Sequence, residues 1–209
     1  HAVASDAVRL ASSTLSDDDA LKAHCMEGGS VIVPKRVLEE LRRLSALDPE
    51  EKITLKWNSK ELSFSIESSG YSLCAKCIAG VYPPYESAIP QHISSSVVVD
   101  LKCFSESLKR GLIFADRNKV MRLRFEASEL TIEGITPGQK EGEEILQIQD
   151  PVQNSFEASY NGHLLNGILG VLNGTKVVLS WEGVNRPMKI SGEDELGVIS
   201  FYLLVPSKF

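Results

Sequence analysis

The stretch "SSVVVDLKCFSESLKRGLIFADRNKVMRLRFEASELTIEGI", residues 95–135, decides the fold because its order of elements occurs three times in the chain. It begins with a short strand, continues with a helical stretch and ends in two alternating runs separated by a tight turn. Segments that start at Ser30 and Ser155 repeat this order. A further strand closes each copy, in "YSLCAKCIAG", "EEILQIQ" and "GVISFYLLV". We therefore predict three β-α-β-β-β repeats of about 55 residues each.

The spacing of apolar residues distinguishes strands from helices within each repeat. Apolar residues alternate in the paired runs, as in Ile53, Leu55 and Trp57, which predicts half-buried hairpins. In the helical stretches the spacing changes to three and four, as in Phe104 and Leu108, which predicts amphipathic helices. The expected fold class is α+β, with helices on one face of antiparallel sheets.

The repeats also give the expected domain boundaries. Residues 1–15, "HAVASDAVRLASSTL", look like the last strand of a fourth copy, and a lone closing strand cannot bury its own face. We therefore expect residues 1–85 to be an incomplete domain, in which the copy from Ser30 pairs with a missing one, and residues 95–209 to be a complete domain of two repeats. Pro-rich "YPPYESAIPQ" predicts a linker, which we place at residues 86–94.

The final residues, "FYLLVPSKF", read as the closing strand of the third repeat. Their alternation predicts that Ile199, Phe201, Leu203 and Val205 face inward. This strand explains an apolar run near residue 205, but the repeat gives no role to residues 206–209.

Composition excludes several classes of protein. Hydrophobic residues make up 43% and charged residues 24% of the chain, which is typical of a soluble globular protein. No apolar run approaches the roughly 18 residues that span a bilayer, so we expect no membrane segment and a cytoplasmic location. The net charge of −6 argues against nucleic-acid binding through bulk charge, but it leaves room for a local basic face.

No motif predicts catalysis, a metal site or a cofactor. Cys74 and Cys77 have a CxxC spacing, but in a strand they point to opposite faces, and the four cysteines are expected to be reduced. The sequence contains no GxSxG, P-loop or GxGxxG motif, and the carboxylates of "EGEE" and "GEDEL" lie beside turns, where acids are usually solvated. We therefore predict no catalytic residue. That the protein is an enzyme is the least favoured of three hypotheses, and the other two are given below.

Basic residues gather on the outward faces of two of the three predicted helices, although the chain is acidic overall. They are either a solvated helix face or a surface that faces phosphates. The third helix, "NGHLLNGILGVLNG", has no Lys or Arg. The candidate residues for contact with DNA are Lys35, Arg36, Arg42, Arg43, Lys102, Lys109 and Arg110.

Five stretches together resemble one family, the bacterial sliding clamp or beta subunit of DNA polymerase III. They occur in the family's order along the whole chain. "VASDAVRLA" is similar to the family's "ATDGHRLA", and "SVIVPKRVLEEL" to its "VIVPRK" strand and helix start. The other three are "AKCIAGVYPPYESAIP", "MRLRFEASELTIEGITPGQKEGEEIL" and the terminal "LLVPSKF".

The resemblance implies a non-catalytic processivity factor of DNA replication. Its members form a head-to-tail homodimeric ring around duplex DNA, with helices lining the hole and without reading the base sequence. The implied partners are duplex DNA, DNA polymerase III alpha, other polymerases and the clamp-loader delta subunit, in a cytoplasmic, nucleoid-associated location. We do not expect these 209 residues alone to close a ring, since the family's ring interface joins the last domain of one subunit to the first of the other.

The resemblance also implies a hydrophobic pocket that binds short linear motifs of those partners. Carried over by position, its residues are Ser5, Asp6, Ala7, Val8, Arg9, Leu10, Pro83, Ser87, Ala88, Asn118, Asn161, Leu164, Asn185, Pro187, Leu203, Leu204, Val205, Pro206, Ser207, Lys208 and Phe209. The chain departs from the family at several of them. The family's Gly-His is Ala7-Val8 here, its Tyr is Leu164, and its final Met-Arg-Leu is Ser-Lys-Phe. These changes predict an altered polarity and motif preference.

Two hypotheses of different classes remain. One is a clamp that encircles DNA and binds partner peptides. The other is a clamp-like protein-interaction scaffold without a role on DNA. The charge of the helix faces separates them, because a surface that faces phosphates should be net positive, whereas basic residues neutralised by acids argue for the scaffold.

Overall fold

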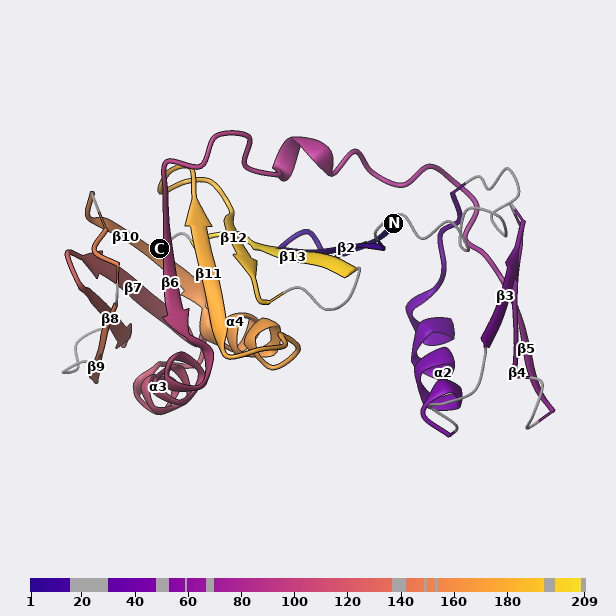
Figure 1. Ribbon diagram of the computed structural model, residues 1–209, viewed down its shortest axis with the longest axis horizontal. Helices are drawn as coiled ribbons and strands as arrows, with labels where there is room; N and C mark the ends of the chain where they lie inside the picture. Colours follow the sequence, from indigo (N-terminus) through magenta and orange to yellow (C-terminus); the bar gives the residue numbers. More distant parts are fainter. Residues whose placement is uncertain are drawn as a thin grey trace. The chain divides into compact units, whose positions relative to one another are not determined.

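The computed structural model describes residues 1–15, 30–47, 53–58, 60–66, 70–136, 142–148, 150–152, 154–193 and 198–207. The chain forms two compact units (Figure 1). Unit 1 comprises His1–Asp18 and Tyr85–Phe209, and unit 2 comprises Asp19–Pro84. The domain boundaries that we predicted at residues 85 and 95 stay a prediction. Unit 1 contains residues from both predicted domains, since residues 1–18 belong to it together with residues 85–209.

Unit 1 contains the second and third predicted repeats, each with the order β-α-β-β-β. The second repeat consists of β6 (Ser95–Asp100), α3 (Leu101–Phe114), β7 (Val120–Glu126), β8 (Glu129–Gly134) and β9 (Glu143–Gln147). The third consists of β10 (Phe156–Asn161), α4 (Gly162–Leu169), β11 (Lys176–Trp181), β12 (Met188–Ser191) and β13 (Val198–Leu204). A short 3-10 helix, η1 (Glu86–Ala88), precedes them. The expected α+β fold class is confirmed.

The two repeats of unit 1 exchange their first strands. In one sheet β6 pairs with β11, so that Val97 lies opposite Leu179. In the other sheet β10 pairs with β7, so that Ala158 lies opposite Leu123. Each repeat therefore completes the sheet of the other, and neither sheet is formed by one repeat alone.

The core of unit 1 lies where the two exchanged sheets meet the helices. Phe156 stacks on Trp181 with ring centroids 4.5 Å apart, and Trp181 lies 4.9 Å from Phe125. These rings come from β10, β11 and β7, so they join the two repeats. Aromatic pairs at such distances add about 0.5–1.5 kcal/mol to the free energy gained by burying their area.

Local chemistry starts both helices of unit 1. The Asp100 carboxylate accepts a hydrogen bond from Cys103 N at 2.7 Å, and the Asn161 side chain accepts one from Leu164 N at 3.0 Å. These are N-cap bonds, which satisfy N–H groups that a helix leaves free at its start. Gly111 of α3 allows close packing, because a Cβ there would lie 2.6 Å from Met121 Cε.

Residues 1–15 form two strands, and not the single closing strand that we expected. β1 (Ala2–Ser5) and β2 (Arg9–Leu15) make a hairpin, and β2 pairs with β13. The sheet order is therefore β1-β2-β13-β12-β11-β6. A sharp turn at residues 6–8 divides the stretch into two strands. The alternation of apolar residues in the sequence did not reveal this turn.

Unit 2 contains the first repeat, with α2 (Lys35–Ser45), β3 (Ile53–Trp57), β4 (Glu61–Ile66) and β5 (Tyr71–Lys76). Its sheet has the order β3-β4-β5. The hairpin turn is confirmed, with Asn58 Oδ1 accepting hydrogen bonds from the N–H groups of Lys60 and Glu61. The expected first strand is reduced to one bridge between Ile32 and Ile78. Among the described residues, no strand pairs with the outer edge of β3.

The predicted inward face of β13 is wrong. Leu204 is fully buried in the main core and Tyr202 packs against it, whereas Ile199 and Val205 are exposed. Leu203 is buried on the opposite side, in register with Leu10 of β2. Alternation identifies two faces of a strand, but the position of the helices decides which of them meets the core.

The described helices include none with the length and apolar character required to cross a lipid bilayer.

Tyr160 of β10 provides a test of the core. Its side chain is fully buried, burial raises the pKa of its phenol, and its hydroxyl has no hydrogen-bond partner among the described residues. An unpaired buried hydroxyl costs about 1–3 kcal/mol. We therefore expect Tyr160→Phe to leave the free energy of unfolding unchanged or to raise it by about 1 kcal/mol, as measured by urea denaturation.

Leu123→Ala in the same core is the comparison, and should lower the free energy of unfolding by about 2–5 kcal/mol. A loss of more than about 1 kcal/mol in Tyr160→Phe would show that the hydroxyl has a partner, and would contradict the assignment.

Candidate functional site

The turn between β1 and β2 presents the first group of predicted pocket residues. Asp6 Oδ1 accepts hydrogen bonds from Val8 N and Arg9 N, and Asp6 Oδ2 lies 3.0 Å from Arg9 Nε. Ser5 Oγ donates to Arg9 O at 3.0 Å and accepts from Ala7 N at 3.2 Å. Burial opposes ionisation of Asp6, but the hydrogen bonds from Arg9 and Val8 lower the pKa of its carboxyl. The turn is held by its own side chains, which fixes the position of Val8.

The segment after β13 lies between this turn and β10. Val205 N donates a hydrogen bond to Val8 O at 2.9 Å, and Ser207 N donates to Ser159 O at 2.7 Å. Two backbone bonds thus hold Val205–Ser207 against the turn between β1 and β2 and against β10, two elements that are distant in the sequence. Lys208 and Phe209 lie outside the described residues.

The N-terminus of α4 forms the third part of the site. Asn161 caps the helix through Leu164 N, and its Nδ2 donates to Asn118 O at 3.3 Å. Gly162 N donates to Lys119 O at 2.8 Å, which ties the same helix start to the loop before β7. These bonds bring Asn118, Asn161 and Leu164 together, and their role in a pocket stays a prediction.

The predicted residues differ in what they can offer to a ligand. Val8 is 44% exposed and Val205 is 40% exposed, so two aliphatic side chains joined through their backbones face solvent. Leu10, Leu203 and Leu204 are buried and support the sheet. Exposed apolar side chains combined with a few polar groups are typical of a peptide-binding surface.

The remaining predicted residues are placed less closely. Pro187 precedes Met188, whose partner in the sheet is Leu204, so the β11–β12 connection with Asn185 reaches the same end of the sheet. Ser87 and Ala88 lie in η1 of unit 1. Pro83 belongs to unit 2. It stays a prediction as a pocket residue.

Sequence reasoning missed two contributors to this site. Ser159 accepts the hydrogen bond from Ser207 through its backbone, which carries no side-chain signal. Gly167 of α4 lies beside Arg9, because a Cβ at Gly167 would be 3.5 Å from Arg9 Nη1. The only signal of this contact in the sequence was the glycine itself, which leaves an exposed position of the helix without a side chain and so lets Arg9 lie close to it.

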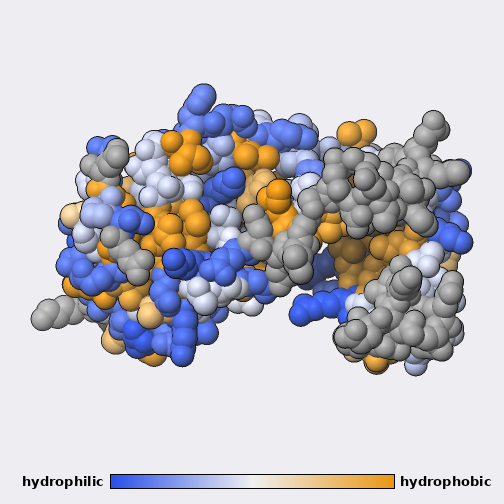
Figure 2. Space-filling view, in the orientation of Figure 1, coloured by the Kyte–Doolittle hydropathy of each residue, from blue (hydrophilic) through white to orange (hydrophobic). Residues whose placement is uncertain are grey.

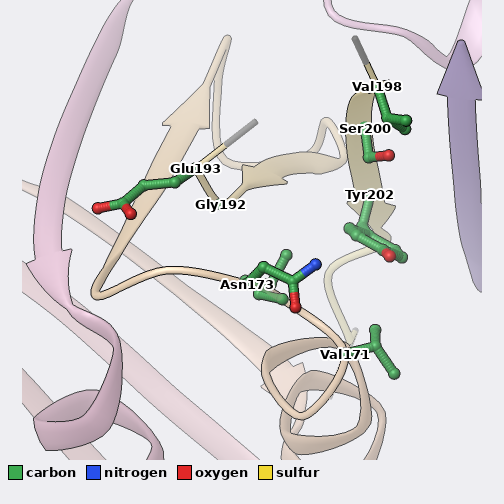
Figure 3. A pocket seen from close by; sticks show the side chains of 8 residues that line it. Val171, Asn173, Gly192, Glu193, Val198, Ser200 and Tyr202 are labelled. Carbon is green, nitrogen blue, oxygen red and sulfur yellow. The ribbon is translucent and has the colours of Figure 1, made fainter. Parts of the chain in front are cut away.

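A hollow of about 370 Å³, open to solvent, lies beyond the C-terminal end of α4 (Figure 3). Its lining includes Val171, Asn173, Ser200 and Tyr202, none of which was predicted as a site residue. Glu193 points away from Ser200 and Tyr202 in Figure 3, and its Oε1 accepts a hydrogen bond from Thr175 Oγ1. The hollow therefore presents mainly neutral side chains.

Three of the seven basic candidates are paired with acids. Lys35 lies 3.5 Å from Glu39, Arg43 lies 2.9 Å from Glu40, and Arg110 lies 2.7 Å from Glu144. The hydrogen bond from Arg110 lowers the pKa of the Glu144 carboxyl. Within the described part of the chain, no ion pair is formed by the side chains of Arg36, Arg42, Lys102 and Lys109.

Comparisons with known proteins agree on one family. A family model described as "DNA polymerase III beta subunit, C-terminal domain" matches residues 86–203. The beta sliding clamp of Pseudomonas putida is 27% identical over 181 residues, 85% of this chain and 47% of that relative. The beta sliding clamp of Pseudomonas aeruginosa is 30% identical over 180 residues, 85% of this chain and 46% of that relative. The chain thus spans about half the length of the curated relatives it matches.

Solved structures show the same fold. Pol III beta from Caulobacter crescentus matches with a TM-score of 0.86 and 22% identity, over 99% of this chain and 54% of that one. A sliding clamp from Pseudomonas aeruginosa, bound to griselimycin, matches with a TM-score of 0.83 and 24% identity, also over 99% and 54%.

Ala7 gives a test of the turn that presents Val8. Its φ is +70°, in the left-handed region, where a residue with a Cβ is strained by about 1 kcal/mol. We expect Ala7→Gly to raise the free energy of unfolding by up to about 1 kcal/mol in urea denaturation. Ala4→Gly in β1 is the matched control and should lower it, since glycine only adds disorder to the unfolded chain there. A loss of stability in Ala7→Gly would contradict this conformation of the turn.

Proposed function

The chain belongs to the DNA polymerase III beta subunit family, and on that premise we propose that it acts as a sliding clamp of DNA replication. In this function the protein catalyses no reaction. It holds the replicative polymerase on duplex DNA by encircling the DNA and binding peptide motifs of its partners. The observation that carries the proposal is the convergence of three separate segments on one exposed apolar surface, through the bonds from Val205 to Val8 and from Ser207 to Ser159.

The chemistry of this surface suits a short linear motif. Val8 and Val205 provide exposed aliphatic contact. Asn161 lies two residues after Ser159, whose backbone accepts the bond from Ser207, and its side-chain amide donates to Asn118 O. A peptide gains affinity from apolar anchors and orientation from a few polar groups. The proposed ligands are motifs of DNA polymerase III alpha, of other polymerases and of the clamp-loader delta subunit.

The DNA role rests on a smaller set of residues than the sequence suggested. Of the seven candidates, those that form no ion pair within the described part of the chain are Lys102 and Lys109 on α3, with Arg36 and Arg42 on α2. Such contacts are independent of base sequence, as a sliding protein requires. In a protein of the relatives' full length, the proposed assembly is a homodimeric ring around duplex DNA in the cytoplasm, associated with the nucleoid.

A second candidate function is a clamp-like interaction scaffold that does not bind DNA. The ion pairs of Lys35, Arg43 and Arg110 favour it, because each removes a positive charge from a helix face. The peptide surface would be retained in both functions, so binding of DNA separates them.

The peptide surface is tested by titrating a fluorescent peptide of the Gln-Leu-x-Leu-Phe type into the chain and measuring anisotropy. We expect saturable binding, and a loss of about tenfold in affinity for Val205→Ser, because that change removes roughly 1.4 kcal/mol of apolar contact. Deletion of residues 206–209 should weaken binding at least as much.

Ile199→Ser is the matched control for the peptide experiment. Ile199 is an exposed aliphatic residue of β13, and it lies six residues before Val205, the first residue whose bond defines the site. The affinity of the Ile199→Ser variant for the peptide should equal that of the unchanged chain. Equal affinities for Val205→Ser, Ile199→Ser and the unchanged chain would refute the assignment of this surface.

The DNA role is tested by measuring affinity for linear duplex DNA at several salt concentrations. We expect weak binding with a Kd on the order of 10–100 µM, falling in affinity as salt rises. Lys109→Glu should weaken it, whereas Lys60→Glu, the same charge change in the β3–β4 turn, should have a smaller effect. Absence of salt-dependent binding would favour the scaffold without a DNA role.

A further inference from the structure

Glu133 of β8 is a nearly buried acid in unit 1. Figure 2 shows hydrophilic side chains over much of the described surface of this unit, so an exposed acid there would be ordinary. Glu133, however, is only 6% exposed. It accepts a hydrogen bond from Arg122 Nη1 at 3.1 Å and one from Arg124 Nη2 at 2.6 Å. A carboxylate at a buried position costs free energy unless it is paired in this way, and a neutral residue would avoid that cost.

The same two arginines join β8 to β10, an outer strand of the sheet β10-β7-β8-β9. Arg122 Nε lies 3.4 Å from Glu157 Oε1, and Arg124 Nε lies 3.1 Å from Glu157 Oε2. In the sheet, Arg122 lies directly opposite Glu133, and Arg124 lies directly opposite Glu157. Two acids and two arginines therefore form one network across β8, β7 and β10, in which each arginine contacts both acids.

This network selects one register for β10. The buried side chains of this strand, Phe156, Ala158 and Tyr160, are all apolar or aromatic, so a slip of two residues would still place such side chains on the core face. The same slip would remove Glu157 from its place opposite Arg124. Determining register is the best-attested role of buried polar and ionic groups, and the network supplies the discrimination that the apolar pattern lacks.

The other sheet of unit 1 shows that the exchange of first strands does not need such a network. Val97 of β6 and Ala158 of β10 are equivalent, since each lies three residues before a helix N-cap. Counted from these two residues, the four positions equivalent to those of the network carry no charge, and they are Ser96, Val178, Ser180 and Ser191. Of the two exchanged strands, the network therefore accompanies β10 and not β6.

β10 is also the exchanged strand that holds the tail segment, Val205–Ser207. Ser159 lies opposite Arg122 in the sheet, and its backbone oxygen accepts the hydrogen bond from Ser207 N at 2.7 Å. The other bond of the tail segment, from its first residue to Val8 O, fixes it to the turn between β1 and β2. The register of β10 therefore decides which backbone oxygen meets Ser207, and a slip of β10 would move one of the two supports of the tail segment.

We propose that Glu133 is a positioning residue for the peptide surface. Through its two arginines it holds Glu157 and fixes the register of β10, and β10 in turn holds Ser207. Glu133 is nearly buried and acts without contacting the peptide. This role rests on the proposed function, since the surface concerned is the proposed peptide surface.

Amide hydrogen exchange of the whole chain, followed by NMR without peptide, tests the effect on the tail segment. In the unchanged chain we expect the Ser207 amide to exchange at least about tenfold more slowly than an unstructured amide, because it donates to Ser159 O. Glu133→Gln should abolish most of this protection, whereas the amide of Leu179 in the other sheet should keep its own. Glu129→Gln is the matched control, because Glu129 is an exposed acid on the same strand and face, and this variant should leave Ser207 protected.

Two results of the exchange experiment would overturn the proposal. One is equal protection of the Ser207 amide in Glu133→Gln and in the unchanged chain. The other is a loss of protection at Leu179 as large as that at Ser207, which would show that Glu133 stabilises the whole unit and does not position the tail segment.

Titration with the fluorescent Gln-Leu-x-Leu-Phe peptide tests the effect on binding. We expect Glu133→Gln to weaken the affinity by about three- to tenfold, because the tail segment is then less well ordered before the ligand binds. Glu157→Gln should have a similar effect. Since both acids act through the same arginines, the double variant should bind at most about twofold more weakly than the weaker single variant.

An unchanged affinity in Glu133→Gln, or losses that multiply in the double variant, would overturn the proposal. Absence of peptide binding to the unchanged chain would instead refute the proposed function. The exchange of the Ser207 amide is measured without peptide, so it would still decide whether Glu133 positions the tail segment.

Discussion

The exchange of first strands between two repeats is the constraint on which the rest of unit 1 depends. β6 and β10 each add to the hairpin of the other repeat, so neither repeat has a complete sheet without its neighbour. The exchange brings Phe125, Phe156 and Trp181 together at centroid distances of 4.5 to 6.2 Å. A small hairpin with one helix buries too little apolar surface to be independently stable, and pairing the repeats overcomes that limit.

The candidate peptide surface is a consequence of this pairing. β10 ends at Asn161, which both caps α4 and contacts the loop before β7, so the strand exchange fixes the helix start. β13 belongs to the same sheet that accepts β6, and the segment after β13 is bonded to Val8 and to Ser159. The surface therefore rests on a rigid framework of strands, and its exposed side chains need not be ordered by the ligand.

Charge is arranged on the same framework. On the sheet of β7, β8 and β10, Glu133 is nearly buried and accepts hydrogen bonds from Arg122 at 3.1 Å and from Arg124 at 2.6 Å. Hydrogen bonding to Glu157 raises the pKa of Arg124, so these charges act within the sheet. Only part of the chain's basic content remains for a phosphate surface, because Arg110 is likewise held by Glu144.

The sequence by itself determined what depends on near neighbours. The periods of 2 and 3.6 gave the strands and helices, Asp100 and Asn161 mark the helix starts, and the threefold order gave the fold class. The resemblance supplied the positions of the pocket residues. Tertiary structure alone decided that β2 pairs with β13, that Leu204 faces the core, and that Ser159 holds Ser207. Those features are bonds and contacts between residues distant in the chain, and local periodicity cannot specify the partner or the register of a strand.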